Sequence, residues 1–228
     1  MEIDRAGRER LIEAIDRFVS EGIPAFEFDD RIHAIAAASS DPTVKRVALC
    51  LWFFYDDVID HHVAWSRQEC DFVQRLVLVL RSDAHVDVIQ SRKWSGLQLP
   101  AIALLLLFAM CTSWLGFGQQ LFAATPVLGV ASIIIAKCRN RRASAPSPER
   151  ITLAPFDSIA SLARIRRRVR EFEKRRYRPE IETRRIRTPG REFILSLMTH
   201  AAWLLLSPLV LVFQAFPRTE SELRVVEN

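Results

Sequence analysis

The chain has 228 residues, with 32 Lys and Arg against 27 Asp and Glu, so its formal net charge at pH 7 is +5. Half of the residues are hydrophobic, which leaves both soluble and membrane classes open. The sequence contains no G-x-x-x-x-G-K-[ST], G-x-S-x-G or H-E-x-x-H motif, so the common phosphate-binding and hydrolytic signatures are excluded. Its four cysteines form no C-x-x-C pair, and we expect reduced thiols and no cofactor.

The amino-terminal region is acidic. Residues 1–91 hold 17 acidic and 10 basic side chains, a net charge of −7. The first residues, MEIDRAGRERL, are charged throughout and lack the apolar stretch of a signal peptide. We therefore expect residues 1–91 to form a module that stays in the cytoplasm.

Local signals predict four short helices in this module. Apolar residues at helical spacing favour one helix over about 4–20 and a second over about 24–38. Asp41-Pro42 is a cap and first-turn pair that opens a third helix. Residues 66–69, Ser-Arg-Gln-Glu, have the pattern of a capping box that opens a fourth.

The first two predicted helices contain the stretch RLIEAIDRFVSEGIPAFEFDDRI. From Asp4 to Ala38 the chain resembles the SHOCT family of short helical hairpins, which occur in many bacterial proteins, often beside membrane spans. An apolar helix, a Gly-Ile turn, then Glu27-Phe28-Asp29 and Arg31 carry the resemblance, although Pro24 stands where that family has a hydroxyl cap. The resemblance implies an interaction or oligomerisation module and brings no catalytic residue with it.

The stretch FFYDDVIDHH, residues 53–62, is the strongest candidate for chemistry. On a helix, Asp56 and Asp60 would share one face, as would Asp57 and His61, so the geometry permits a metal ion. Chemistry on a prenyl diphosphate needs a second acidic cluster across a deep apolar cavity, which about 90 soluble residues cannot enclose. We therefore interpret the stretch as a solvated or salt-bridged helix end without a metal, and keep a metal-dependent enzyme as the alternative.

An almost unbroken apolar run, residues 49–55, precedes the acidic stretch. A helix that is apolar all round is buried on more than one side, so this run is predicted to form the centre of the module. The alternative is that part of it is exposed as a partner surface, because aromatic side chains dominate binding sites as well as cores.

Three apolar segments without charged residues follow, at 99–117, 121–136 and 193–217. A membrane span needs about 20 apolar residues, and none of the three shows a polar stripe. The first two segments predict a transmembrane hairpin over 97–137. Small and hydroxylated residues are expected to let its helices pack closely, namely Thr112, Ser113, Thr125, Gly129 and Ser132.

Basic residues flank the predicted hairpin on both sides: Arg92, Lys93, Lys137, Arg139, Arg141 and Arg142. Because Arg and Lys accumulate on the cytoplasmic side of spans, both flanks are expected to be cytoplasmic. Pro208 interrupts the third segment and is expected to kink it. That segment either spans the bilayer or is re-entrant, so the side on which the tail, 218–228, lies stays open.

The loop at 138–192 is strongly basic, since residues 137–192 hold 18 basic and 7 acidic side chains, a net charge of +11. An apolar stripe at helical spacing, made of Ile159, Leu162, Ile165, Val169 and Phe172, predicts an amphipathic helix over 158–177. Its cationic face is predicted to contact anionic lipid headgroups. The candidate lipid-contact residues are Arg164, Arg166, Arg167, Arg168, Arg170, Lys174, Arg175 and Arg176.

Two alternatives for this loop stay open. Its apolar stripe could dock on the acidic module, since −7 against +11 favours that pairing. Nucleic-acid binding has enough charge but no groove-reading or base-stacking module, so we do not expect it.

Taken together, the sequence predicts an all-α integral membrane protein. Its expected partners are the lipid bilayer and a protein, or a second copy, bound through residues 1–91. The expected role is that of a membrane-anchored, non-enzymatic interaction or assembly protein. The alternative is a membrane-embedded, metal-dependent enzyme that uses Asp56, Asp57 and Asp60.

Overall fold

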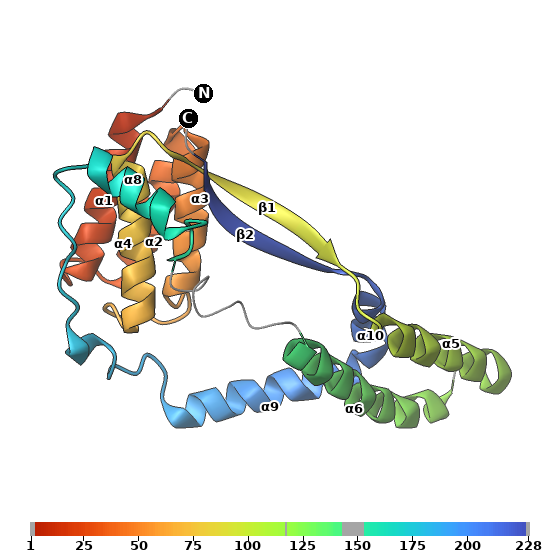
Figure 1. Ribbon diagram of the computed structural model, residues 1–228. Helices are drawn as coiled ribbons and strands as arrows, with labels where there is room; N and C mark the ends of the chain where they lie inside the picture. Colours follow the sequence, from red (N-terminus) through yellow and green to blue (C-terminus); the bar gives the residue numbers. More distant parts are fainter. Residues whose placement is uncertain (1–2, 117, 143–152, 227–228) are drawn as a thin grey trace. The chain divides into compact units, whose positions relative to one another are not determined.

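The computed structural model describes residues 3–116, 118–142 and 153–226, and most of them are helical (Figure 1). The chain divides into two compact units, which are described separately. Unit 1 comprises Met1–Ile89, Pro146–Ile186 and Ser221–Asn228, and unit 2 comprises Gln90–Ala145 and Arg187–Glu220. The acidic module and most of the basic loop therefore belong to one unit.

Unit 1 contains the four predicted amino-terminal helices, at α1 (Arg5–Val19), α2 (Ala25–Ala38), α3 (Pro42–Leu51) and α4 (Arg67–Arg81). Their predicted caps are present. The Asp41 carboxylate accepts a hydrogen bond from the Thr43 backbone N–H at 2.8 Å, and Ser66 with Glu69 forms a complete capping box. These caps satisfy backbone N–H groups that the first helical turn leaves without partners.

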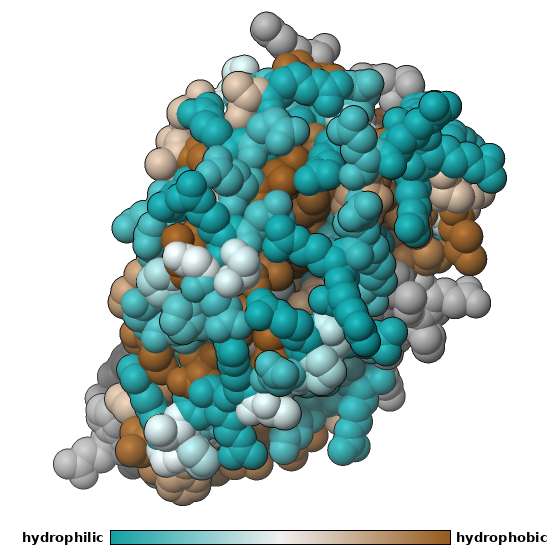
Figure 2. Space-filling model, turned by 90° about the vertical axis from the view of Figure 1, so that its left-hand side faces the viewer, coloured by the Kyte–Doolittle hydropathy of each residue, from teal (hydrophilic) through white to brown (hydrophobic). Residues whose placement is uncertain are grey.

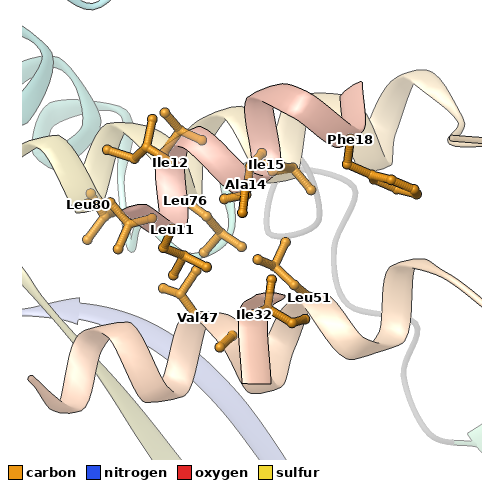
Figure 3. Close-up of a cluster of buried hydrophobic side chains, with 14 of the residues drawn as sticks. Leu11, Ile12, Ala14, Ile15, Phe18, Ile32, Val47, Leu51, Leu76 and Leu80 are labelled. Atoms are coloured by element: carbon orange, nitrogen blue, oxygen red, sulfur yellow. The ribbon is translucent and has the colours of Figure 1, made fainter. Parts of the chain in front are cut away.

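The core of unit 1 lies where α1, α2, α3 and α4 meet (Figure 3). Phe18 of α1 stacks on Phe28 of α2, with ring centroids 4.5 Å apart, and meets Trp65 edge-on at 5.5 Å. Leucine, isoleucine and valine side chains fill the centre, among them Leu11, Ile15, Ile32, Val47, Leu51, Leu76 and Leu80. The apolar stripe on each helix therefore faces this single cluster.

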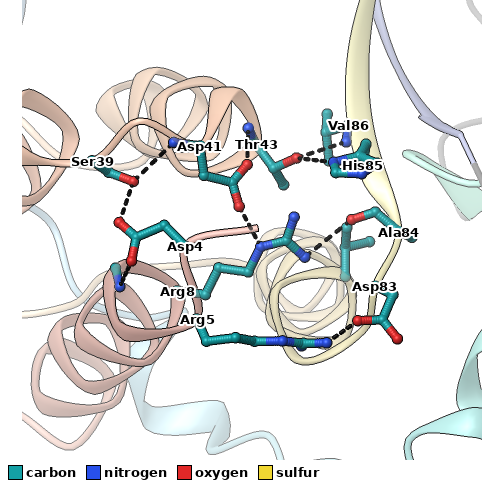
Figure 4. Close-up of polar contacts among 12 residues, drawn as sticks. Asp4, Arg5, Arg8, Ser39, Asp41, Thr43, Asp83, Ala84, His85 and Val86 are labelled. Carbon is teal, nitrogen blue, oxygen red and sulfur yellow. Dashed lines mark hydrogen bonds and ion pairs between the residues drawn. The ribbon is translucent and has the colours of Figure 1, made fainter. Parts of the chain in front are cut away.

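A buried ion pair crosses this unit (Figure 4). Arg8 is 1% exposed and Asp41 is fully buried, and the Arg8 Nε donates to the Asp41 carboxylate at 2.7 Å. Arg8 Nη1 also donates to the carbonyls of Ser82 at 2.7 Å and Ala84 at 3.1 Å. One guanidinium thus joins α1 to the start of α3 and to the chain that leaves α4.

Burial by itself raises the pKa of Asp41, but hydrogen bonds from Arg8 and the Thr43 backbone outweigh it and hold the pKa below its ordinary value of 3.8. A carboxyl whose pKa is lowered on folding stabilises the folded state above its unfolded pKa. This contribution is present at neutral pH and is lost as the pH falls below 3.8 through the lowered pKa.

Asp41→Ala is expected to lower the free energy of unfolding by about 3–5 kcal/mol, because it leaves the Arg8 charge buried without a counterion. Urea unfolding of the full chain at pH 7, followed by circular dichroism, measures the change. The control is Asp83→Ala, which removes the exposed pair with Arg5 and should cost less than about 1 kcal/mol. Equal losses in the two variants would contradict this role for Asp41.

The all-α prediction needs a correction, because the structure contains a two-stranded sheet. β1 (His85–Lys93) runs from residues of unit 1 into unit 2, and β2 (Arg218–Val226) runs back, so the strands are antiparallel (Figure 1). Lys93 and Glu220 form an ion pair at 2.6 Å across the ladder. The sequence pattern missed these strands because each one finds its hydrogen-bonding partner more than a hundred residues away.

Unit 2 contains α5 (Gln98–Leu115), α6 (Gln119–Arg142), α9 (Pro189–Leu205) and α10 (Ser207–Ala215). The chain bends by 80° between α9 and α10, next to Pro208, as the expected kink predicts. Among the described residues, no single helix is long and apolar enough to cross a membrane, whereas the bent pair α9 and α10 meets both criteria when taken together.

The basic loop folds differently from the prediction. Its described part begins at residue 153, and α8 (Ile159–Arg168) ends well before residue 177. The later residues continue irregularly through the short 3₁₀ helix η2 (Pro179–Ile181). Their carbonyls accept hydrogen bonds from α4, with Gln74 donating to Arg175 at 3.0 Å, so tertiary bonds replace helical ones.

Candidate functional site

The acidic stretch does not lie on a helix. α3 ends at Leu51, a single 3₁₀ turn η1 (Trp52–Phe54) follows, and Tyr55 has extended backbone dihedral angles. The helical spacing on which a shared metal-binding face depended is therefore absent. The prediction of a polar helix end was wrong for the same reason.

This stretch instead caps α2 from outside. The backbone N–H of Phe26 donates to the Asp60 carboxylate at 3.1 Å, and the N–H of Ala25 donates to the His61 carbonyl at 2.8 Å. Pro24, at the N-cap, has no side-chain group that accepts such a bond. An ordinary cap has a hydroxyl side chain as the acceptor. Here the acceptor is Asp60, which lies 34 positions after Phe26 in the sequence.

Asp56 and His61 stabilise turns within the stretch itself. The Asp56 carboxylate accepts from the Val58 N–H at 2.9 Å, while the Asp56 N–H donates to Nε2 of His61 at 2.9 Å. His61 is thus held as the tautomer that carries its proton on Nδ1, which lies 2.6 Å from the His62 carbonyl. The Tyr55 hydroxyl donates to Asp29 of α2. The histidine nitrogen that a metal would need already has a partner.

Among the residues that the structure describes, no three His, Cys, Asp or Glu side chains are grouped so as to hold a metal ion. A metal site usually needs several ligands converging at about 2 Å from the ion. Asp56, Asp57, Asp60 and His61 therefore form a structural turn in this fold, and this geometry gives no support to the metal-dependent alternative.

Asp60→Ala is expected to lower the free energy of unfolding by about 1 kcal/mol, because α2 loses its external cap. Asp57→Ala is the matched control in the same turn; its side chain is exposed, and we expect a change within about 0.5 kcal/mol. Calorimetric titration of the full chain with Mg²⁺ or Zn²⁺ should show no saturable binding that either substitution removes. Saturable binding lost in Asp57→Ala would restore the metal interpretation.

The apolar run before this turn divides between core and surface. Leu51 and Tyr55 are buried, whereas Leu49 is 65% and Phe53 73% exposed. Trp52 is also exposed and meets Phe53 edge-on, with ring centroids 5.4 Å apart. The core interpretation therefore holds for part of the run, and contact of the exposed part with a partner stays a prediction.

The basic segment, here residues 159–186, packs on α1 and α4. Ile165 and Ile181 are buried in the core of unit 1, and Leu162, Val169 and Phe172 pack against the same cluster. These residues include most of the predicted apolar stripe, so the stripe faces the acidic module rather than standing free for lipid. Ile159, the first residue of the stripe, is exposed.

Ion pairs fasten the basic segment to acidic side chains of the module. Lys174 pairs with Asp71 at 2.6 Å and Arg175 with Asp16 at 3.1 Å. Arg184 hydrogen-bonds Glu21 at 3.1 Å, and this contact holds the pKa of Glu21 below its ordinary value against the opposing effect of burial. Acidic side chains of the module therefore form specific ion pairs with basic side chains of the basic segment.

The predicted lipid-contact residues divide into two groups. Lys174 and Arg175 are paired with acidic residues of the module, as given above. The other side chains, all exposed, are Arg164, Arg166, Arg167, Arg168, Arg170 and Arg176. Their contact with anionic headgroups stays a prediction.

The sequence interpretation overlooked Arg8. The signal was present, because Arg8 stands three and four positions before Leu11 and Ile12, within the apolar stripe of α1. An arginine in such a stripe points into the core and needs a buried acidic partner. Asp41, already identified as a cap, is that partner.

Comparison of the chain with protein-family models, with curated proteins and with solved structures found no match.

Proposed function

We propose that this chain is a membrane-anchored interaction or assembly protein, in which unit 2 enters the lipid and unit 1 remains in water as the binding module. The distribution of polar and apolar side chains in unit 2 carries this proposal. Large apolar side chains of α5, α6, α9 and α10 point outward, including Leu99, Leu106, Met110, Trp114, Val127, Ile134, Phe193, Met198, Leu205 and Phe213.

Polar side chains lie inside the same unit. The Trp203 indole N–H donates to the Ser132 hydroxyl at 2.7 Å, and the Gln214 amide donates to the Ser132 carbonyl at 3.0 Å. Ser207 donates to the Thr125 carbonyl at 2.7 Å. Bonds between helices made by Ser, Thr and Gln are typical of packing in lipid, where the surroundings offer such groups no water.

Gly129 adds close packing to these bonds. A Cβ atom at this position would lie 2.9 Å from the Leu204 Cα, closer than side-chain carbon atoms tolerate. Gly129 thus lets α6 and α9 approach closely, whereas the sequence predicted that the small residues would join the two helices of the hairpin. Thr112 and Ser113 of α5 instead donate to the Ala109 carbonyl of their own helix. In water, the exposed apolar surface of this unit would be costly, whereas in lipid it needs no cover.

The strand pair supports one topology for such an anchor. β1 leads into α5, and β2 follows α10. Both strands contain charged residues, such as Arg92 and Glu222, which are costly to place in lipid. Because the strands pair, the tail would lie on the same membrane face as unit 1. The α5–α6 hairpin and the bent pair α9–α10 would each enter and leave through that face.

The lengths of two helices bear on this arrangement, in which no described helix is by itself long and apolar enough to cross a membrane. At 1.5 Å per residue, α5 extends about 27 Å and α10 only about 14 Å, against a hydrocarbon core of about 30 Å. A helix as short as α10 suits a re-entrant segment better than a full crossing. The basic residues at both flanks favour the cytoplasm for the shared face.

Cysteine labelling in intact cells with a membrane-impermeant maleimide tests the topology. We expect Lys45→Cys in unit 1 and Glu222→Cys in the tail to be shielded, and Gly118→Cys at the hairpin tip to be labelled. Burial raises the pKa of the native Cys50 and Cys70 thiols to about 11, which keeps their background reaction low. Labelling of Glu222→Cys with Lys45→Cys still shielded would mean that the last apolar segment spans the bilayer.

The exposed aromatic pair of unit 1, Trp52 with Phe53, suits contact with a protein partner or a second copy. A photo-crosslinking amino acid at position 53, in the full chain in its native membrane, should give one dominant product, and the same group at the exposed position 67 should not. Phe53→Ser in an otherwise native chain should abolish complex formation with the species so identified. Equal, diffuse products from both positions would contradict an interaction surface there.

A further inference from the structure

A cavity of about 530 Å³ lies within unit 1, beneath the basic segment. Its walls come from α1, α4 and residues 171–181. Figure 2 views the molecule from the side on which α1 and the residues after α8 lie in Figure 1, and it shows hydrophobic side chains between hydrophilic ones. Cavities of about 300–1,000 Å³ are the usual size of small-molecule sites.

Apolar groups form much of the cavity lining. Ile15 and Val19 come from α1, Val73 and Val77 from α4, and Phe172 from the basic segment. At the ~30 Å³ that a water-sized group occupies in a liquid, the cavity has room for roughly eighteen such groups. This space suits one acyl chain and is too small for two.

A second, more open hollow of about 460 Å³ adjoins the first, and its lining holds four arginines and three carboxylates. The two cavities share Asp16, Ser20, Arg81 and Arg175. Arg81 donates to the Glu171 carbonyl at a long 3.5 Å, and Arg10 donates to the Ala6 carbonyl at 3.3 Å. Arg17 pairs with Glu13 and Arg175 with Asp16. Arg10 and Arg81, with these long bonds to carbonyls, remain against one further carboxylate, Glu9. This excess of one positive charge favours an anion.

A polar atom of the first cavity also lacks a partner. Gln74 donates its amide N–H to the Arg175 carbonyl at 3.0 Å, which fixes the orientation of the amide. Its carbonyl Oε1 is buried and accepts no hydrogen bond within the described part of the chain. A ligand hydroxyl near Arg175 would supply the missing donor.

We propose that these joined cavities bind a single-chain anionic amphiphile of the lysophospholipid class, with one acyl chain, a phosphate and a free hydroxyl. The chain would occupy the apolar cavity, the phosphate would contact Arg81 and Arg10, and the hydroxyl would donate to Gln74. The inference depends on unit 1 alone and stands whether or not unit 2 enters lipid.

The test uses the full chain in phosphatidylcholine nanodiscs and a lysophosphatidate whose acyl chain carries a diazirine. After photolysis, mass spectrometry should locate saturable crosslinks on the lining of the apolar cavity, in residues 15–20, 73–81 or 171–178. Arg81→Gln should raise the half-saturating concentration about tenfold or more, because a hydrogen bond to a charged group is lost. Arg67→Gln, an exposed arginine of α4 outside the lining, is the matched control and should change it less than about twofold.

Val77→Trp fills the apolar cavity and should abolish the crosslinks there. Circular dichroism checks that this variant folds. If the variant does not fold, Arg81→Gln still decides the test. Crosslinks confined to unit 2, or equal affinity in Arg81→Gln and the native chain, would overturn the proposal. Full displacement of the probe by inorganic phosphate alone would also overturn it, since the site would then bind an anion without an acyl chain.

Discussion

The Arg8–Asp41 ion pair is the contact on which the arrangement of unit 1 depends. Two charges removed from water are tolerated only when each satisfies the other and nearby polar groups complete their hydrogen bonds. Asp41 meets this condition by also capping α3. Arg8 meets it in part: Nη1 binds the carbonyls of Ser82 and Ala84, while the buried Nη2 has no hydrogen-bond partner among the described residues. The pair therefore fixes α1 against α3 and sets the point from which β1 departs.

The basic segment completes unit 1 by combining two kinds of contact. Ile165 and Ile181 add apolar area to the core, while Lys174, Arg175 and Arg184 pair with acidic side chains of the module. Exposed ion pairs of this kind each contribute little, so the buried apolar groups supply most of the stability and the charges specify the register. The same arrangement leaves the two joined cavities along α1 and α4, where the proposed amphiphile would bind.

Unit 2 also buries a small apolar cluster, Ala101, Leu128, Ile135 and Leu211, but it exposes many apolar side chains and places hydrogen-bonded serine, tryptophan and glutamine between its helices. This arrangement suits a lipid solvent and explains why the sequence shows no polar stripe in its apolar segments. The β1–β2 pair is what relates the chain entering α5 to the chain leaving α10. The pairing of the two strands favours a re-entrant last segment over a span. The apolar sequence of that segment did not distinguish these two possibilities.

The sequence by itself determined the amino-terminal helices and their caps, because Asp41, Ser66 and the apolar periodicity act within one or two turns of the chain. It also gave the kink near Pro208 and the charge attraction between the module and the basic segment. Only the tertiary structure decided that Asp60 caps a helix 34 positions away, that α8 stops at Arg168, and that β1 pairs with β2. Each of these depends on a partner distant in the chain, and local propensity carries no information about such partners.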